Sequence, residues 1–212
     1  MKALVFNGPR DIQYETFRDP SLETNNSVIL KVERCSICGS DLHMYHGENL
    51  GKASYGGDVM PFCVGHEFAG EIVEVGSQVH RFRVGQQVLA SGGAPCGKCK
   101  NCLSGHAQRC SGWTAFGLSG AMNGGQAEFV NVPMADLTLQ PIPEGVTVEQ
   151  SILLTDAMCT AYFGLTRTNL EPGDVVAVVG LGPIGLIGVE LAFTLGASEV
   201  FAIDPVSHRR DH

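Results

Sequence analysis

Residues 174–204 read DVVAVVGLGPIGLIGVELAFTLGASEVFAID, and this segment indicates the fold class. Its first part, 174–180, is a short and nearly continuous apolar run, as expected of a strand buried in a parallel sheet. Residues 183–195 have the length of a helix that ends at Gly196, and 199–204 form a second apolar run. The order strand, helix, strand predicts one βαβ unit and hence an α/β fold.

The loop between the first strand and the helix reads GLGPIG and has the G-x-G-x-x-G spacing. Such a loop lets the backbone approach a pyrophosphate, and free N–H groups at the helix start bind the phosphates. Asp204 ends the next strand about 20 residues further on, where an acid bonds the ribose hydroxyls. We therefore predict a dinucleotide site that prefers NAD; NADP stays open because Arg209 and Arg210 could reach a 2′-phosphate, and a tight turn without ligand is the alternative. The residues expected at the dinucleotide are Gly180, Gly182, Pro183, Ile184, Gly185, Asp204 and Arg209.

The preceding part of the chain is rich in short runs of strand length, separated by glycine and proline. Their β-branched and aromatic content predicts an irregular, loop-rich β barrel or sandwich. From residue 144 to 168 the apolar positions follow helical spacing, which predicts a connecting helix. The expected strands are 3–7, 12–16, 28–34, 69–75, 87–91 and 127–132.

Composition excludes several classes of function. The chain has 212 residues with 44% apolar and 17% charged residues, as in an ordinary globular protein, and its net charge is −8. Nucleic-acid and anionic membrane surfaces need clustered Lys and Arg, so we expect neither partner. No targeting signal is visible, and the longest apolar run is interrupted by glycines and a proline. A cytoplasmic protein with reduced thiols is expected.

Four of the eight cysteines fall in the sequence CGKCKNCLSGHAQRC, within a lobe expected over residues 91–111. Their C-x2-C-x2-C-x7-C spacing allows four thiolates to surround one ion, as in a closed structural zinc site. An iron–sulfur cluster, a redox pair and disulfides are the alternatives, but structural zinc is favoured. The four ligands would be Cys96, Cys99, Cys102 and Cys110.

A second set of metal-binding side chains is spread over three segments. CGSDLH (38–43) contains Cys38, GHEFAG (65–70) contains His66, and a later segment contains Asp156. One thiolate, one imidazole and one carboxylate could form a three-ligand zinc site whose fourth position is open to water or substrate. No local spacing proves this, because the ligands would meet only in the fold.

GHEFAG, CGSDLH, the four-cysteine lobe and GLGPIG, taken together, resemble the zinc-dependent medium-chain alcohol dehydrogenase family over essentially the whole chain. The resemblance implies a GroES-like β-rich catalytic domain with two zinc ions, followed by an incomplete Rossmann fold. We expect these domains at 1–157 and 158–212. Chains of the family run well beyond this length, so we expect either a fragment or a surface covered by self-association, as in a homo-oligomer.

The resemblance also implies roles for single residues. Cys38 and His66 match the first two catalytic zinc ligands. Asp156 stands at the third, as in members that use aspartate, such as bacterial secondary alcohol dehydrogenases and glutathione-independent formaldehyde dehydrogenases. Glu67 matches a residue that can approach the metal from behind.

The implied reaction is hydride transfer between an alcohol, polyol, aldehyde or ketone and NAD, with zinc as Lewis acid. Ser40 and His43 match a proton relay, and Thr160 matches a threonine near the nicotinamide. The alternative is a non-catalytic, zinc-bearing scaffold that packs on itself or on a partner.

Overall fold

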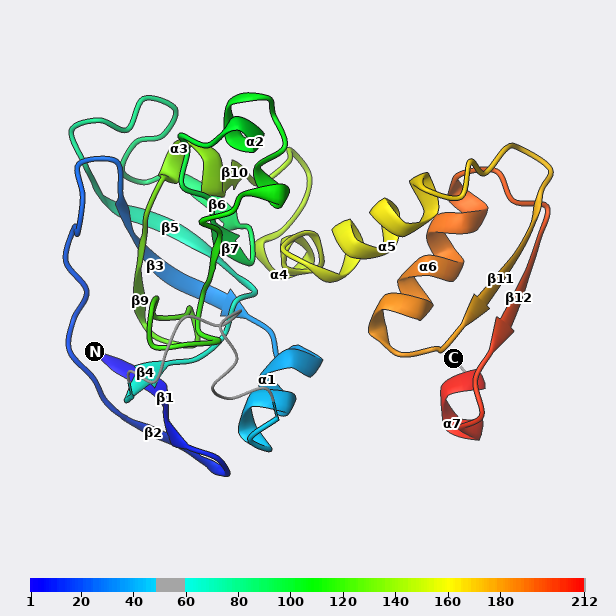
Figure 1. The fold of residues 1–212 in the computed structure, drawn as a ribbon, viewed down its shortest axis with the longest axis horizontal. Coiled ribbons are helices and arrows are strands. Elements are labelled where there is room, and N and C mark those ends of the chain that lie inside the picture. Colours follow the sequence, from blue (N-terminus) through cyan, green and yellow to red (C-terminus); the bar gives the residue numbers. More distant parts are fainter. Residues whose placement is uncertain (49–59, 212) are drawn as a thin grey trace. The chain divides into compact units, whose positions relative to one another are not determined.

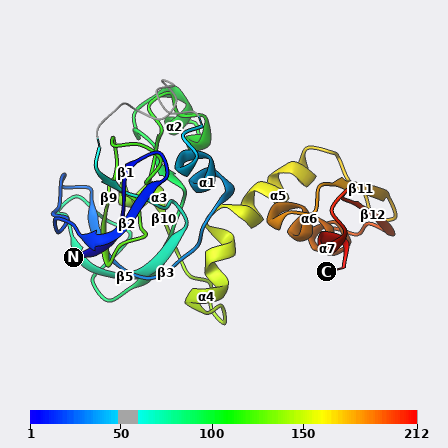
Figure 2. The same ribbon diagram turned by 90° about the horizontal axis from the view of Figure 1, so that it is seen from below.

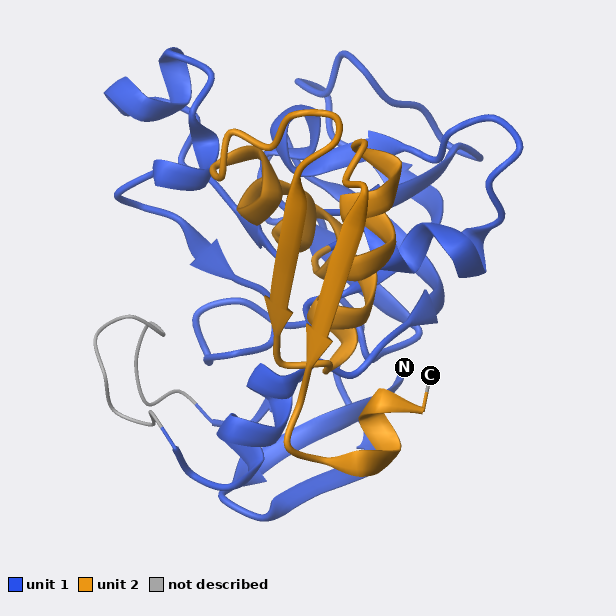
Figure 3. Ribbon diagram, turned by 90° about the vertical axis from the view of Figure 1, so that its right-hand side faces the viewer, with its two compact units in different colours: residues 1–155 blue, residues 156–212 orange. Residues whose placement is uncertain are grey.

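A computed structural model describes residues 1–48 and 60–211 and divides the chain into two compact units, Met1–Thr155 and Asp156–His212. Figure 3 shows them as unit 1 and unit 2. The division follows Thr155, whereas the sequence placed it after residue 157. None of the helices in the described residues combines the length and the apolar character that crossing a bilayer requires.

Unit 1 is built on an antiparallel sheet of five strands in the order β10-β6-β5-β3-β9. At its centre β3 pairs with β5, and Cys35 lies opposite Phe68 at the end of the pairing. Figure 1 and Figure 2 both show these two strands side by side. The strands are β3 (Val28–Cys35), β5 (Phe68–Val75), β6 (Gln87–Ala90), β9 (Phe129–Val132) and β10 (Leu139–Pro141).

Two smaller antiparallel sheets contain the other strands among the described residues of unit 1. One has the order β2-β1-β4, and the other pairs β7 with β8. Their bounds are β1 (Lys2–Gly8), β2 (Asp11–Thr16), β4 (Phe62–Cys63), β7 (Gly93–Ala94) and β8 (Thr114–Ala115). The helical segments are α1 (Gly39–Tyr45), α2 (Lys100–Leu103), η2 (Ala107–Arg109), α3 (Ala135–Thr138), α4 (Val148–Ser151) and η3 (Ile152–Leu154).

Alternate side chains of the central strands point into one apolar core, as the period of a strand requires. Phe68 of β5 is fully buried there and meets Phe116 edge to face, with ring centroids 5.0 Å apart. This core fixes the register of β3 and β5, because a slip by one residue would turn its side chains outward. The core includes Val28, Leu30, Phe68, Ile72, Val88, Phe116, Val130, Val132 and Leu139.

Unit 2 contains the predicted βαβ unit. Strands β11 (Val175–Val179) and β12 (Glu199–Ile203) are parallel, with α6 (Pro183–Thr194) between them in the chain. Helix α5 (Ala157–Thr166) packs on α6, and the short α7 (Ser207–Arg210) follows β12. The core of this unit contains Leu165, Val176, Leu191, Ala192, Ala197 and Val200.

The single helix expected from 144 to 168 is wrong. The chain forms α4, η3 and then α5, with a break at Asp156, whose φ of −148° is not helical. The apolar residues on either side of the break serve different cores. Ile152 packs with Ala69 and Leu89 in unit 1, whereas Leu165 packs in unit 2.

Candidate metal centres and dinucleotide loop

The four cysteines of the lobe come together as expected for one ion. Their sulfur atoms all lie within 4.8 Å of one another. The Cys99 and Cys102 sulfurs are 3.4 Å apart, which is far longer than the ~2 Å of a disulfide bond. No disulfide joins any of the eight cysteines, all of which lie in described residues.

The protonation of the lobe fits a cation site. Backbone N–H donation from Cys102 is the main cause that lowers the pKa of Cys99 to about 6. Burial, followed by the neighbouring Cys99 thiol, raises the pKa of Cys102 to about 12. The raised pKa keeps the Cys102 thiol protonated at neutral pH in the metal-free lobe, and a tetrahedral divalent ion would supply the positive charge that favours its thiolate.

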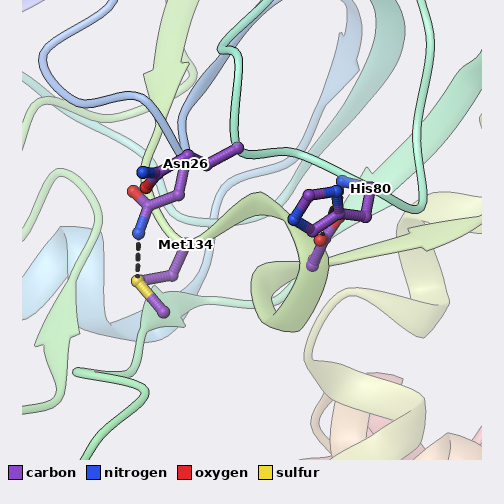
Figure 4. A pocket seen from close by; sticks show the side chains of 5 residues that line it. Asn26, His80 and Met134 are labelled. Carbon is purple, nitrogen blue, oxygen red and sulfur yellow. Dashed lines mark hydrogen bonds between the residues drawn. The ribbon is translucent and has the colours of Figure 1, made fainter.

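A hollow of about 360 Å³ lies beside the lobe and is drawn in Figure 4. Met134 separates the two, because its side chain accepts a hydrogen bond from Asn26 Nδ2 at 2.9 Å and also packs against Gly97 of the lobe. The Asp136 carboxylate accepts the backbone N–H groups of His80 and Arg81, each at 3.0 Å. The polar groups of this hollow thus serve the fold, and we assign it no ligand. Its lining is Asn26, Gln78, His80, Met134 and Asp136.

The second cluster forms in unit 1 where the chain leaves β3 and enters β5. Ligand atoms of Cys38, His66 and Glu67 lie within 4.8 Å of one another. His66 and Glu67 are 4% and 7% exposed, so the cluster is closed to bulk water on that side. The pairing of β3 with β5 brings the two segments together, although 28 positions separate Cys38 from His66 in the sequence.

The environment of Cys38 favours a thiolate. Its hydrogen bond with His66 is the main cause that lowers the pKa of the thiol; burial opposes this effect, and Ser40 reinforces it. Ser40 Oγ also lies 3.3 Å from His66 Nε2. A thiolate beside a buried imidazole is a donor pair that zinc prefers.

Asp41 belongs to this cluster, and the sequence analysis did not identify it. Its Oδ2 accepts the Cys38 N–H at 2.9 Å, and its Oδ1 lies 3.4 Å from His66 Nδ1. Asp41 is 5% exposed, and Oδ1 accepts no hydrogen bond within the described part of the chain. The available signal was the spacing, since an acid three residues after a helix N-cap forms a capping box.

Three more residues were predicted for this site, namely His43, Asp156 and Thr160. His43 is in the last turn of α1, where its Nδ1 is 2.5 Å from Glu48 Oε2 at an exposed position. In unit 2, Thr160 Oγ1 donates to Asp156 Oδ1 at 2.8 Å at the start of α5. Asp156 directly follows Thr155, the last residue of unit 1.

The glycine loop of unit 2 has the local geometry of a phosphate-binding turn. Gly180 has φ +98°, a conformation that favours glycine, and a Cβ on Gly185 would lie 1.8 Å from the Gly180 carbonyl oxygen. Gly182 is the N-cap of α6 and Pro183 its first residue, so backbone N–H groups at this helix start point into the loop.

Asp204 fixes this loop to the end of β12. Its Oδ2 accepts the Leu181 N–H and its Oδ1 the Val206 N–H, each at 2.8 Å. The two N–H groups hold the pKa of the Asp204 carboxyl below its usual range, and the Leu181 N–H makes the larger contribution. Arg209 Nη1 lies 3.5 Å from Oδ2. The predicted Asp204 and Arg209 are thus adjacent to the loop, while Ile184 is 45% exposed on α6.

Comparison with known proteins finds similar proteins among the alcohol dehydrogenases. Residues 24–144 match the family model described as the alcohol dehydrogenase GroES-like domain. The chain is 40% identical over 210 residues to a probable zinc-binding alcohol dehydrogenase of Mycobacterium tuberculosis, covering 99% of this chain and 53% of that protein. It is also 36% identical to the medium chain reductase/dehydrogenase ucsI of Acremonium sp. This match covers 99% of this chain and 71% of that protein.

Among solved structures, alcohol dehydrogenase TADH from Thermus sp. ATN1 superposes with a TM-score of 0.91 at 33% identity. The match covers 100% of this chain and 60% of that chain. The chain spans little more than half the length of the Mycobacterium tuberculosis relative, since the match covers 53% of that protein.

Proposed function

Because the chain belongs to the alcohol dehydrogenase family with a GroES-like domain, we propose that it carries the metal site and the coenzyme loop of a zinc-dependent dehydrogenase. The reaction would move hydride between an alcohol or carbonyl compound and a nicotinamide dinucleotide. The observation that carries this proposal is the Cys38–His66 cluster, in which a thiol with a lowered pKa lies beside a buried imidazole.

The donors suit a catalytic zinc ion. If His66 bound zinc through Nε2, its ring proton would reside on Nδ1 and face Asp41 Oδ1, a buried oxygen that accepts no hydrogen bond in the described structure. We propose Asp156 as the third ligand, since one peptide bond links it to unit 1. When bound, zinc would polarise the substrate oxygen as a Lewis acid.

The chain's own residues would then handle the proton and the coenzyme. Ser40 and His43 lie three residues apart on α1 and so share a face, which suits passage of a proton from the substrate oxygen to Ser40 Oγ and on to His43. Thr160 would contact the nicotinamide. Gly180, Gly182, Pro183, Ile184 and Gly185 would hold the phosphates, with Asp204 and Arg209 at the ribose and a preference for NAD over NADP.

The lobe would bind a second, structural zinc ion, because four cysteines leave no open position for substrate. We also propose a cytoplasmic homo-oligomer acting on a small molecule. A non-catalytic scaffold is not favoured, since the relatives are named as zinc-type dehydrogenases and the ligand set is complete in the sequence.

Zinc stoichiometry tests the two metal sites together. We expect two zinc ions per chain in the wild type, and one each in Cys38→Ser and in Cys99→Ser. A coenzyme-dependent change of nicotinamide absorbance with a panel of alcohols tests the reaction. One zinc in both the wild type and Cys38→Ser would contradict the catalytic site, and no turnover with any alcohol or aldehyde would contradict the proposed activity.

A further inference from the structure

Ser36 holds the buried carboxylate of Glu67 at the edge of the candidate catalytic site. Its hydroxyl donates a hydrogen bond to Glu67 Oε2, and its backbone N–H donates to the Glu67 carbonyl oxygen at 3.1 Å. Ser36 lies just after β3 and two residues before Cys38, so one short segment carries both the metal-binding thiol and this anchor.

Ser36 is itself held in place by Gln126, which is 8% exposed. Gln126 Nε2 donates to the Ser36 carbonyl oxygen at 3.0 Å, and its backbone N–H donates to Val64 O at 2.9 Å. The glutamine side chain crosses Gly65, where a Cβ would come within 2.4 Å of it. The backbone of Ser36 is therefore held by a side chain from a distant segment of the chain.

The Glu67 carboxylate has two possible partners. One of its oxygens bonds Ser36, and a carboxylate oxygen also lies within 4.8 Å of the Cys38 sulfur and a His66 ring nitrogen. A buried carboxylate needs a donor or a cation to offset its lost hydration. Among the described residues, Ser36 Oγ supplies the hydrogen bond that this carboxylate receives.

We propose that Ser36 is a positioning residue that restrains Glu67 and so limits its entry into the coordination of the metal at Cys38 and His66. This inference rests on the metal site proposed above. Without the hydroxyl, the strongest attraction left for the buried carboxylate is the divalent ion. Ser36→Ala should therefore increase carboxylate ligation and slow metal release.

The test uses the full chain loaded with Co²⁺, whose d–d absorption weakens as the coordination number rises. We expect Ser36→Ala to lower this absorption and to slow metal transfer to a chelator about tenfold, which is the lower end of the range over which residues beside metal ligands change metal affinity. Ser36→Thr retains the hydroxyl and should behave as the wild type. Combining Ser36→Ala with Glu67→Gln should abolish both changes, because a neutral amide is a poor ligand.

Two results would overturn the proposal. One is an unchanged spectrum and release rate in Ser36→Ala; the other is an equal change in the Glu67→Gln background, which would assign the effect to general loosening of the fold. The Cys38→Ser variant separates this failure from that of the metal site. If its cobalt spectrum equals that of the wild type, cobalt occupies the lobe alone and the underlying site is wrong.

Discussion

Among single residues, Asp41 connects two of the candidate ligands. It accepts the Cys38 N–H and faces His66 Nδ1 at 3.4 Å, so it fixes both the helix start and the orientation of the imidazole. The neutral amide of Asp41→Asn would bind the ring N–H less strongly and could turn its own N–H toward it. We expect metal affinity at this site to fall about 10- to 100-fold.

Competition between the protein and a chelator measures this change, with release of one zinc per chain as the readout. Asp211→Asn, which alters an exposed carboxylate in unit 2, is the matched control and should leave the affinity unchanged. Equal affinity in Asp41→Asn and the wild type would show that Asp41 only caps α1.

In the four-cysteine lobe, we expect the ionisation of the Cys99 thiol to make stability and alkylation depend on pH. The pKa of Cys99 is about 6, below the 9.0 of a free thiol, so its ionisation stabilises the folded, metal-free lobe above pH 9.0. This stabilisation declines as the pH falls and is gone below about 6. In metal-free protein we expect alkylation of Cys99 to be half-maximal near pH 6, with mass spectrometry as the readout.

Cys63 provides the internal comparison for that experiment. It is fully buried, and burial raises its pKa to about 12, so it should resist alkylation at the same pH values. A Cys99 that reacts only near pH 9 would contradict the donation from the Cys102 N–H that we assign as the main cause.

Within single elements, the glycine loop leaves no room for a side chain at Gly185. A Cβ there would overlap the Gly180 carbonyl oxygen at 1.8 Å, and the strand or the helix would have to move. We expect Gly185→Ala to destabilise unit 2 by about 1–3 kcal/mol, as overpacking does, and to weaken NAD binding.

Gly188→Ala, in the same helix, is the matched control. A Cβ at Gly188 meets no atom within 4 Å, and alanine favours a helix over glycine by about 1 kcal/mol, so this variant should be at least as stable as the wild type. Hydrogen exchange in α6 and β12 measures both variants. Equal protection in the two variants would contradict a close approach of Gly185 to Gly180.

The sequence predicted the long elements better than the short ones. The runs 28–34 and 69–75 correspond to β3 and β5, because runs of strand length that are rich in β-branched residues are a clear signal. Strands of two residues, such as β4 and β7, carry no periodicity. The break at Asp156 was missed because helical spacing continues across it, while the apolar residues on each side join different cores.

The candidate site could be predicted only in part for a similar reason. Cys38 and His66 could be proposed as donors, but their proximity depends on the register of β3 against β5, which is fixed by core packing. The spacing of Asp41 indicates a helix cap but not its approach to His66, and the hydrogen bond of Ser36 to Glu67 has no signal in the residue spacing. The four-cysteine lobe was easier to predict, since its ligands are close in the sequence.

For the molecule as a whole, one face of the parallel sheet of unit 2 is exposed among the described residues. Strands of a parallel sheet are normally covered on both faces, yet the apolar side chains directed away from the unit's core are exposed. Val179 is 80% exposed and Phe201 is 52% exposed. Val175 and Ile203 are the other large apolar residues exposed on this face. We expect the 212-residue chain to self-associate through this face, because burying it removes apolar surface from water.

Charge on this face should therefore favour the monomer. Phe201→Lys would place an ammonium group in the interface. Removing an unpaired charge from water costs on the order of several kcal/mol of free energy. Sedimentation over a range of concentrations should show a dimer or larger species for the wild type and a monomer for this variant. Val84→Lys changes an apolar residue of unit 1 that is 60% exposed, and it should associate like the wild type. A wild-type chain that remains monomeric at every concentration, or an equal effect of both substitutions, would show that this face is not where two copies meet.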